Sequence, residues 1–117
     1  EVHAICVHLG LREAHRQKQV SLLFELLDRL PAKAPVIIAG DFNDWRLKAD
    51  AVLSERLIEA FGERFGSPAR SFPARLPLLR LDRIYVRNAM PHAAKVLSNY
   101  PWSHLSDHAP LAAEINV

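Results

Sequence analysis

The sequence predicts an α/β (α+β) fold in which helices cover one face of a mixed β-sheet. Two observations predict this class. Strand-like and helix-like stretches alternate through the first half of the chain, and three further strand-like stretches follow in the second half. The chain has 117 residues, of which 50% are apolar and 24% are charged, so it can form one globular domain with a modest core.

The first half of the chain alternates between the two patterns. Glu1–Leu9 is a strand rich in β-branched and apolar residues, and because it begins almost at the first residue we expect sequence to precede it in a longer protein. Arg12–Leu30 places its apolar residues at helical spacing and ends before Pro31. Val36–Ala39 is a short apolar run that predicts a buried strand, and Lys48–Phe61 predicts a second helix.

The second half begins with an irregular segment and ends in strands. Ser67–Arg80 contains three prolines and three arginines, which predicts a surface loop. The arginines can receive an anionic substrate, although a solvated basic loop explains them equally well. The three predicted strands that follow are Leu81–Arg87, His92–Ser98 and Ala109–Val117.

The composition restricts the class of protein. No run approaches the roughly 20 apolar residues that a membrane-spanning helix requires. The lone cysteine, Cys6, excludes an internal disulfide, and its apolar strand pattern predicts a buried, inert thiol. The formal net charge is +2 and the isoelectric point is about 9.0, which favours anionic partners only weakly. We therefore expect a cytoplasmic protein without a membrane span.

Four ionisable residues interrupt the strand patterns. Asp82 shares a strand face with Ile84 and Val86, so its carboxylate is partly desolvated and requires a partner. His108 is the natural candidate, because a carboxylate bonded to an imidazole fixes the tautomer and supports the protonated form. Taken singly, the other two have simpler explanations. They are Asp41, which fits a turn after the second strand, and His8, which fits a structural role at the end of the first.

Taken in chain order, the motifs that contain these four residues resemble those of the endonuclease/exonuclease/phosphatase superfamily of metal-dependent hydrolases. The specific pair is Gly-Asp-Phe-Asn at residues 40–43 and Ser-Asp-His-Ala-Pro-Leu at residues 106–111, with Leu-Asp-Arg-Ile at residues 81–84 between them. The resemblance implies that residues 1–117 form the C-terminal half of such a domain, half of a four-layer α/β/β/α sandwich. The family's upstream Asn that contacts the phosphate and its upstream Glu that binds the metal have no counterpart here.

The resemblance also implies an activity. It indicates a metal-dependent phosphoesterase in which water attacks phosphorus, with nucleic acid, a phospholipid or another phosphate ester as substrate. Asp107 would bind Mg²⁺ or Mn²⁺, which prefer oxygen ligands. Asp82 would orient His108, and Asp41 would orient or deprotonate the attacking water. The candidate catalytic residues are therefore His8, Asp41, Asn43, Asp82 and His108, and His8 and Asn43 would also contact the substrate phosphate.

A second class of function also fits, namely a catalytically inactive fragment or binding module that retains the motifs. A natural sequence before Glu1 that contains the Asn and the Glu would favour the enzyme, and a natural start at Glu1 would favour the module. Half a sandwich leaves one sheet face uncovered, and an apolar face predicts a two-fold homodimer packed sheet on sheet. The residues expected on this face are Ile84, Val86, Leu111 and Ala113, or their alternates along the strands.

Overall fold

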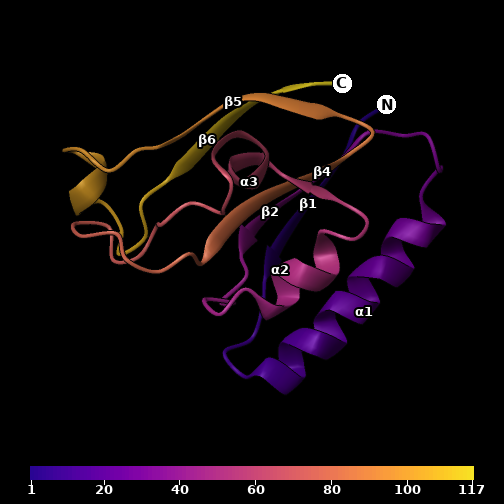
Figure 1. Cartoon of the computed structure of the whole chain (residues 1–117), viewed down its shortest axis with the longest axis horizontal. Coiled ribbons are helices and arrows are strands. Elements are labelled where there is room, and N and C mark those ends of the chain that lie inside the picture. Colours follow the sequence, from indigo (N-terminus) through magenta and orange to yellow (C-terminus); the bar gives the residue numbers. More distant parts are fainter.

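Six strands and three α-helices follow one another in the computed structural model, which describes residues 1–117 (Figure 1). The strands are β1 (His3–His8), β2 (Val36–Asp41), β3 (Ile58–Glu59), β4 (Asp82–Arg87), β5 (Met90–Val96) and β6 (Leu111–Asn116). The helices are α1 (Glu13–Arg29), α2 (Lys48–Leu53) and α3 (Ala60–Phe65), with a 3₁₀ turn, η1 (Trp102–His104), before β6. None of these helices is both long and apolar enough to cross a membrane.

Four of the strands form a mixed sheet in the order β1-β2-β4-β3. β1 and β2 are parallel, and α1 connects them, whereas β4 is antiparallel to both β2 and β3. β5 and β6 pair antiparallel as a separate two-stranded sheet, which lies beside the mixed sheet in Figure 1. The predicted mixed α+β fold is thereby confirmed, but the last two strands form a second, separate sheet, which was not predicted.

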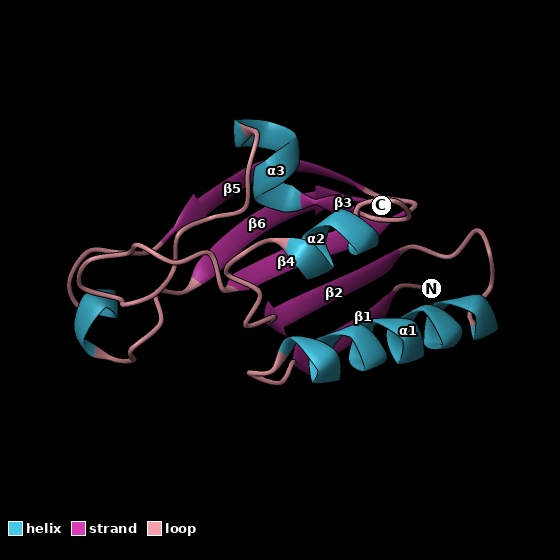
Figure 2. Cartoon of the chain, turned by 60° about the horizontal axis from the view of Figure 1, so that its bottom comes forward, coloured by secondary structure: helices cyan, strands magenta, loops and turns pink.

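The main core lies between the mixed sheet and helices α1 and α2. The buried side chains of α1, Val20, Leu23 and Leu27, pack with Val36 of β2 in one apolar cluster. Burial of each such side chain contributes roughly 1.5–3 kcal/mol. The helix ends before Pro31, which cannot continue it, so the prediction of a helix here is confirmed. Figure 2 shows α1 and α2 together on this side of the sheet.

The single helix expected over Lys48–Phe61 is wrong. α2 ends at Leu53, and the short strand β3 then pairs with β4. Glu59 starts α3, because its carboxylate accepts a hydrogen bond from the amide of Gly62 at 2.8 Å. The apolar residues that share one helical face in the sequence pack in different places: Leu53 enters the main core, and Phe61 enters a second cluster.

The opposite face of the mixed sheet has no helix over β1. Ala4, Cys6 and His8 alternate onto this face and are exposed. The prediction of a buried Cys6 is therefore wrong, because the strand turns this residue away from the helices. On β4, Val86 is buried and Ile84 is half-buried, so the uncovered apolar surface lies on β1 and not on these two residues.

A smaller cluster supports the second sheet. Ala60, Phe61 and Ala69 form its buried centre, and Leu111 and Ala113 of β6 pack against it. These two β6 residues are half-buried by the cluster and do not form an open face as expected. The packing holds the beginning of β6 beside β4, and it therefore places the residues that precede β6 next to the mixed sheet.

We propose that, when the 117-residue chain is studied alone, a second copy covers the exposed face of β1. Val2, Ala4 and Cys6 form an apolar strip there, and burial of such surface gains roughly 25 cal/mol per Å². Light scattering at micromolar concentration should give twice the 13.2 kDa mass of one chain. Ala4→Glu places a charge in the strip and should return the monomer. A wild-type chain that stays monomeric and soluble would contradict the proposal.

Candidate active site

The ends of three neighbouring strands bring three ionisable residues into one row. In the register of the sheet, His8 of β1 lies opposite Asp41 of β2, and Asp41 lies opposite Asp82 of β4. Residues in register across a sheet point to the same face, so all three side chains leave the sheet on the side away from α1. We call these residues the strand-end row.

Gly40 allows the row to form. Its φ is +148°, and a Cβ atom at this position would lie 1.9 Å from the carbonyl oxygen of Val7. Only glycine permits β1 and β2 to approach each other so closely at this point. Gly40 therefore sets the spacing between His8 and Asp41, which follow the close contact on the two strands.

His108 reaches the row from the segment before β6, and the predicted pairing with Asp82 is present. The Nδ1 atom of His108 lies 2.6 Å from Oδ2 of Asp82. The hydroxyl of Ser71 donates to the same oxygen at 2.6 Å, and the ring of Phe72 lies with its centroid 5.0 Å from the centroid of the imidazole. The imidazole is thus fixed on one side by a carboxylate and on another by an aromatic ring, with Nε2 left to face the row.

The surroundings of His108 raise its pKa above the usual value. Burial alone would lower this pKa, but the hydrogen bond to Asp82 and the negative charge of Asp82 outweigh it, and Asp41 and Asp107 add to the effect. The imidazole side chain is 26% exposed, so solvent can still exchange its proton. His108 is therefore a group that can hold or release a proton near neutral pH.

Asp41 lies at the centre of the row. Its Oδ2 atom is 3.6 Å from Nε2 of His8 and 3.8 Å from Nε2 of His108. Both distances exceed those of a hydrogen bond, so this oxygen is left able to accept a hydrogen bond from a water or a substrate. Its Oδ1 atom accepts a hydrogen bond from the backbone amide of Asn43 at 2.9 Å, which fixes the carboxylate.

Asn43 joins the loops that follow β1 and β2. Its backbone has a left-handed φ of 50°, which asparagine tolerates better than most residues. The side-chain Nδ2 donates to the carbonyl oxygen of Leu9 at 2.6 Å. The amide still has a second N–H and a carbonyl oxygen, so the predicted phosphate contact of Asn43 would use these remaining groups.

The row and His108 contain one group of potential metal ligands. One ligand atom each from Asp41, Asp82 and His108 lies within 4.8 Å of the other two. Oδ2 of Asp82 already accepts two hydrogen bonds, so this residue suits orientation of the imidazole better than metal binding. The predicted ligand Asp107 lies outside the group and is exposed, with its backbone carbonyl fixed by the amide of Ala74 at 2.8 Å. Its carboxylate is open to solvent, and its role as a metal ligand stays a prediction.

A cavity of about 370 Å³ borders the row. Residues of β2 and β4 form one wall, and the segment 106–111 forms the other, with Asp82 and His108 both reaching the cavity. A second hollow of about 240 Å³ between α1 and α2 contains none of the row residues. The first cavity is therefore the one in which a substrate would meet the ionisable groups.

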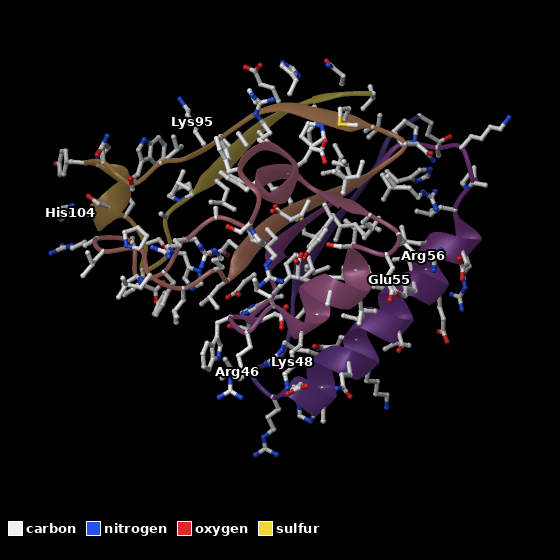
Figure 3. All side chains as sticks on the ribbon, in the orientation of Figure 1. Arg46, Lys48, Glu55, Arg56, Lys95 and His104 are labelled. Atoms are coloured by element: carbon white, nitrogen blue, oxygen red, sulfur yellow. The ribbon has the colours of Figure 1, made fainter.

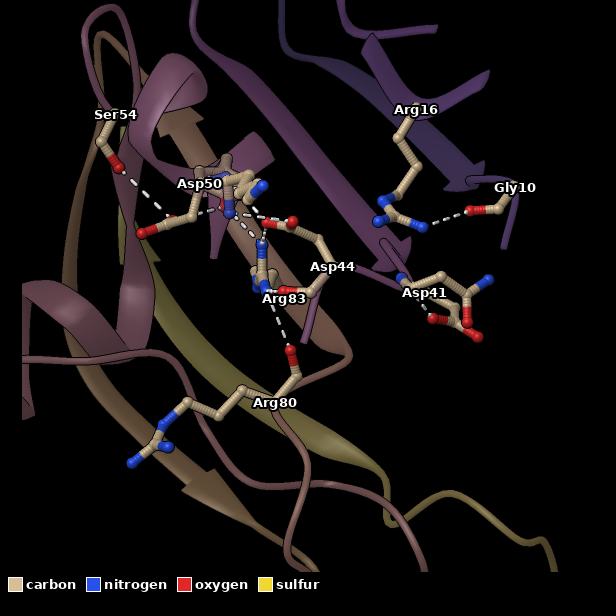
Figure 4. Close-up of polar contacts among 11 residues, drawn as sticks. Gly10, Arg16, Asp41, Asp44, Asp50, Ser54, Arg80 and Arg83 are labelled. Atoms are coloured by element: carbon tan, nitrogen blue, oxygen red, sulfur yellow. Dashed lines mark hydrogen bonds and ion pairs between the residues drawn. The ribbon is translucent and has the colours of Figure 1, made fainter. Parts of the chain in front are cut away.

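Two features of the site were not predicted from the sequence. Ser71 stands in the proline-containing loop, where no strand pattern or motif marks it. Arg83 forms a buried ion pair with Asp44 behind the row, and Figure 4 shows the two side chains in contact. A signal for this pair was present, because an arginine that alternates onto the core face of a strand requires an acidic partner.

Comparison with models of known protein families finds one match. Residues 2–108 match the model of the Endonuclease/Exonuclease/phosphatase family. The Escherichia coli (strain K12) protein YbhP is 56% identical over 118 residues, which cover 99% of this chain and 47% of YbhP. The chain thus spans about half the length of this relative.

Solved structures share the fold. A humanised D. rerio TDP2 aligns with a TM-score of 0.81 at 20% identity, covering 99% of this chain and 55% of that one. A mannosyl-6-phosphatase from Bacteroides thetaiotaomicron aligns with a TM-score of 0.77 at 21% identity, covering 97% of this chain and 51% of that one. At these identities the likeness concerns the fold alone.

Replacement of Asp82 by Asn is expected to lower the pKa of His108, because it removes the charge that favours the imidazolium and keeps the size of the side chain. NMR titration of the imidazole protons measures this pKa, and His92, which pairs with Glu114 instead, is an internal control. An unchanged pKa of His108 would contradict the assignment.

The same shift has a consequence for stability. A histidine whose folded pKa is raised stabilises the fold below its unfolded pKa of about 6.5, and this contribution is lost as the pH rises through the folded pKa. The wild-type chain should therefore lose more unfolding free energy than Asp82→Asn as the pH rises from about 6.5 through the folded pKa of His108. Urea unfolding across this range measures the difference, and equal losses would contradict the prediction.

Proposed function

Because the chain belongs to the Endonuclease/Exonuclease/phosphatase family, we propose that a protein of its relatives' full length hydrolyses a phosphate ester by attack of water on phosphorus, with the aid of a divalent cation. This chain contributes the strand-end row, His108 and Asn43. The proposal concerns the full-length protein, since the chain covers 47% of YbhP.

One observation carries the proposal. Nδ1 of the His108 imidazole lies 2.6 Å from Oδ2 of Asp82, and its Nε2 lies 3.8 Å from Oδ2 of Asp41. Asp82 and His108 border the cavity of about 370 Å³, and Asp41 lies beside Asp82 in the strand-end row. A carboxylate that orients and charges an imidazole, next to a second carboxylate, is an arrangement for proton transfer and for binding a developing negative charge.

The residues divide the chemical work. The carboxylate of Asp41 can orient the attacking water and accept its proton, because its Oδ2 has no hydrogen-bond donor closer than 3.6 Å. His108, as the imidazolium, can donate from Nε2 to a non-bridging oxygen of the phosphate. His8 is 78% exposed at the edge of the row and can donate to the phosphate or to the leaving oxygen.

A divalent cation would be held in part by Asp107, whose carboxylate is exposed at the rim of the site. Asp41 is the other candidate, because its Oδ2 has no hydrogen-bond donor closer than 3.6 Å. Carboxylate oxygens of this kind suit Mg²⁺ or Mn²⁺. When bound, such a cation supplies charge stabilisation for the phosphoryl oxygens.

The loops around the site are compatible with a nucleic acid, a phospholipid or another phosphate ester as substrate. Arg70 and Arg75 are exposed and can meet an anion, whereas Arg80 is tied to the carbonyl oxygen of Pro68 at 2.9 Å. On the loop after β2, the guanidinium of Arg46 lies 4.6 Å from the ring centroid of Trp45, and Figure 3 shows Arg46 at the surface. These side chains can contact the parts of a substrate outside the phosphate.

The full-length protein should hydrolyse bis-p-nitrophenyl phosphate in the presence of Mg²⁺ or Mn²⁺, and chelation by EDTA should abolish the reaction. Release of p-nitrophenolate, followed by absorbance, measures it. Hydrolysis that continues undiminished in EDTA would remove the cation from the mechanism. Binding of a phosphate ester without hydrolysis would instead support the alternative of a binding module.

Asp82→Asn in the full-length protein should reduce the turnover number by about 10²-fold or more, because the imidazole loses the group that orients and charges it. The loss of stability should be small beside the loss of turnover, since the amide keeps the volume and can still accept a hydrogen bond. Steady-state kinetics and thermal unfolding on the same preparation separate the two effects. Wild-type turnover in this variant would show that the Asp82–His108 pair has no part in the reaction.

A further inference from the structure

We infer that Arg83 and Asp44 are positioning residues whose buried ion pair sets the place of the loop that carries Asn43, directly after Asp41 at the end of β2, relative to the strand that carries Asp82. The catalytic consequence rests on the proposed function. The structural consequence does not, and the experiment below reads the two separately.

The pair lies directly behind the strand-end row. Arg83 follows Asp82 in β4, so its side chain points to the opposite face of the sheet, where it is fully buried. Asp44 follows Asn43 directly and is also fully buried. Each member of the pair is therefore the sequence neighbour of a site residue.

A single guanidinium holds both segments. Nη1 of Arg83 donates to Oδ2 of Asp44 at 2.8 Å, and Nη2 donates to the backbone carbonyl of Asp44. Nη2 also donates to the backbone carbonyl of Arg80 at 2.9 Å, just before β4 begins. The guanidinium carbon lies 5.9 Å from the ring centroid of Phe42, the residue between Asp41 and Asn43. The loop after β2 and the start of β4 are thus fixed to the same planar group (Figure 4).

Asp44 also fixes the rest of its loop through hydrogen bonds. Its carboxylate also accepts hydrogen bonds from the backbone amides of Lys48 at 3.0 Å and Asp50 at 2.9 Å. Two non-glycine residues of the loop have left-handed backbones, Asn43 with a φ of 50° and Leu47 with a φ of 62°. For leucine this conformation is unfavourable and persists only where surrounding contacts impose it. The bonds that converge on Asp44 are those contacts.

Positioning is a separate claim from stability. A buried ion pair is weak evidence for stability, because the cost of desolvating both charges offsets their attraction. By contrast, a displacement of about 1 Å in a reacting group can reduce a rate by about 10²-fold. Because Arg83 is bonded to Asp44 and to Arg80 at once, its geometry bears directly on how the loop that carries Asn43 is held against the start of β4.

The decisive variant is Arg83→Lys, which keeps the buried positive charge and so avoids leaving Asp44 unpaired. A lysine ammonium cannot reproduce the bonds of the guanidinium to Asp44 and Arg80 in their fixed plane. The matched control is Arg87→Lys. Arg87 is on the same face of the same strand and also donates to backbone carbonyls, those of Leu27 at 3.2 Å and Pro31 at 2.8 Å, but it lies at the end of β4 away from the row.

Two readouts are made on each variant. In the 117-residue chain, ¹⁵N-NMR follows the backbone amide of Asn43, which bonds to Asp41, and its hydrogen exchange should become faster in Arg83→Lys and stay unchanged in Arg87→Lys. In the full-length protein, Arg83→Lys should reduce the turnover number by about 10²-fold with little change in KM, while Arg87→Lys keeps wild-type kinetics. Asp44→Asn is a second variant, because it keeps the size of the side chain and should give the same pattern if Arg83→Lys does not fold.

The outcomes separate the two claims. Unchanged exchange at Asn43 in folded Arg83→Lys and Asp44→Asn would overturn the positioning inference, whatever the kinetics. Faster exchange at Asn43 in both Arg83→Lys and Arg87→Lys would also overturn it, because the effect would then be a general loss of stability. A wild-type protein that hydrolyses no phosphate ester would count against the proposed function, and the exchange data would still decide the positioning of the loop.

Discussion

The site depends on the register in which β1, β2 and β4 pair. That register places His8, Asp41 and Asp82 opposite one another where the strands end, and it is possible only because Gly40 lets the backbone of β2 approach the carbonyl of Val7. A shift of one residue in any one of these strands would turn its member of the row to the helix face, where side chains are buried. The sheet therefore places three of the site residues, and the loops then add His108 and Asn43.

The two faces of the sheet have different tasks. On the helix face, the apolar core and the buried pair of Arg83 and Asp44 hold the strands and the loop after β2. On the other face, His108 arrives from the segment before β6 and is fixed by Asp82 and Ser71. Side chains alternate along β4, so Arg83 packs in the core while its neighbour Asp82 faces the site.

The sequence was most informative where the surroundings of a residue follow from its near neighbours in the chain. The apolar spacing of α1 and the partner required by Asp82 were both predictable, since each depends on a rule of burial. The division of residues 48–61 into α2, β3 and α3 was not, because it depends on which segment pairs with β4. Ser71 was equally hidden, since its contact with Asp82 is made by a loop without regular structure.

We propose that this face of the sheet serves the attack of water on phosphorus. The sharpest test is hydrolysis of a phosphodiester by the full-length protein in H₂¹⁸O, with mass spectrometry of both products. One ¹⁸O atom is expected to enter the phosphate-containing product, and none is expected in the alcohol. Label in the alcohol would place the attack on carbon, and it would contradict the assignment of Asp41 and His108 to a reaction at phosphorus.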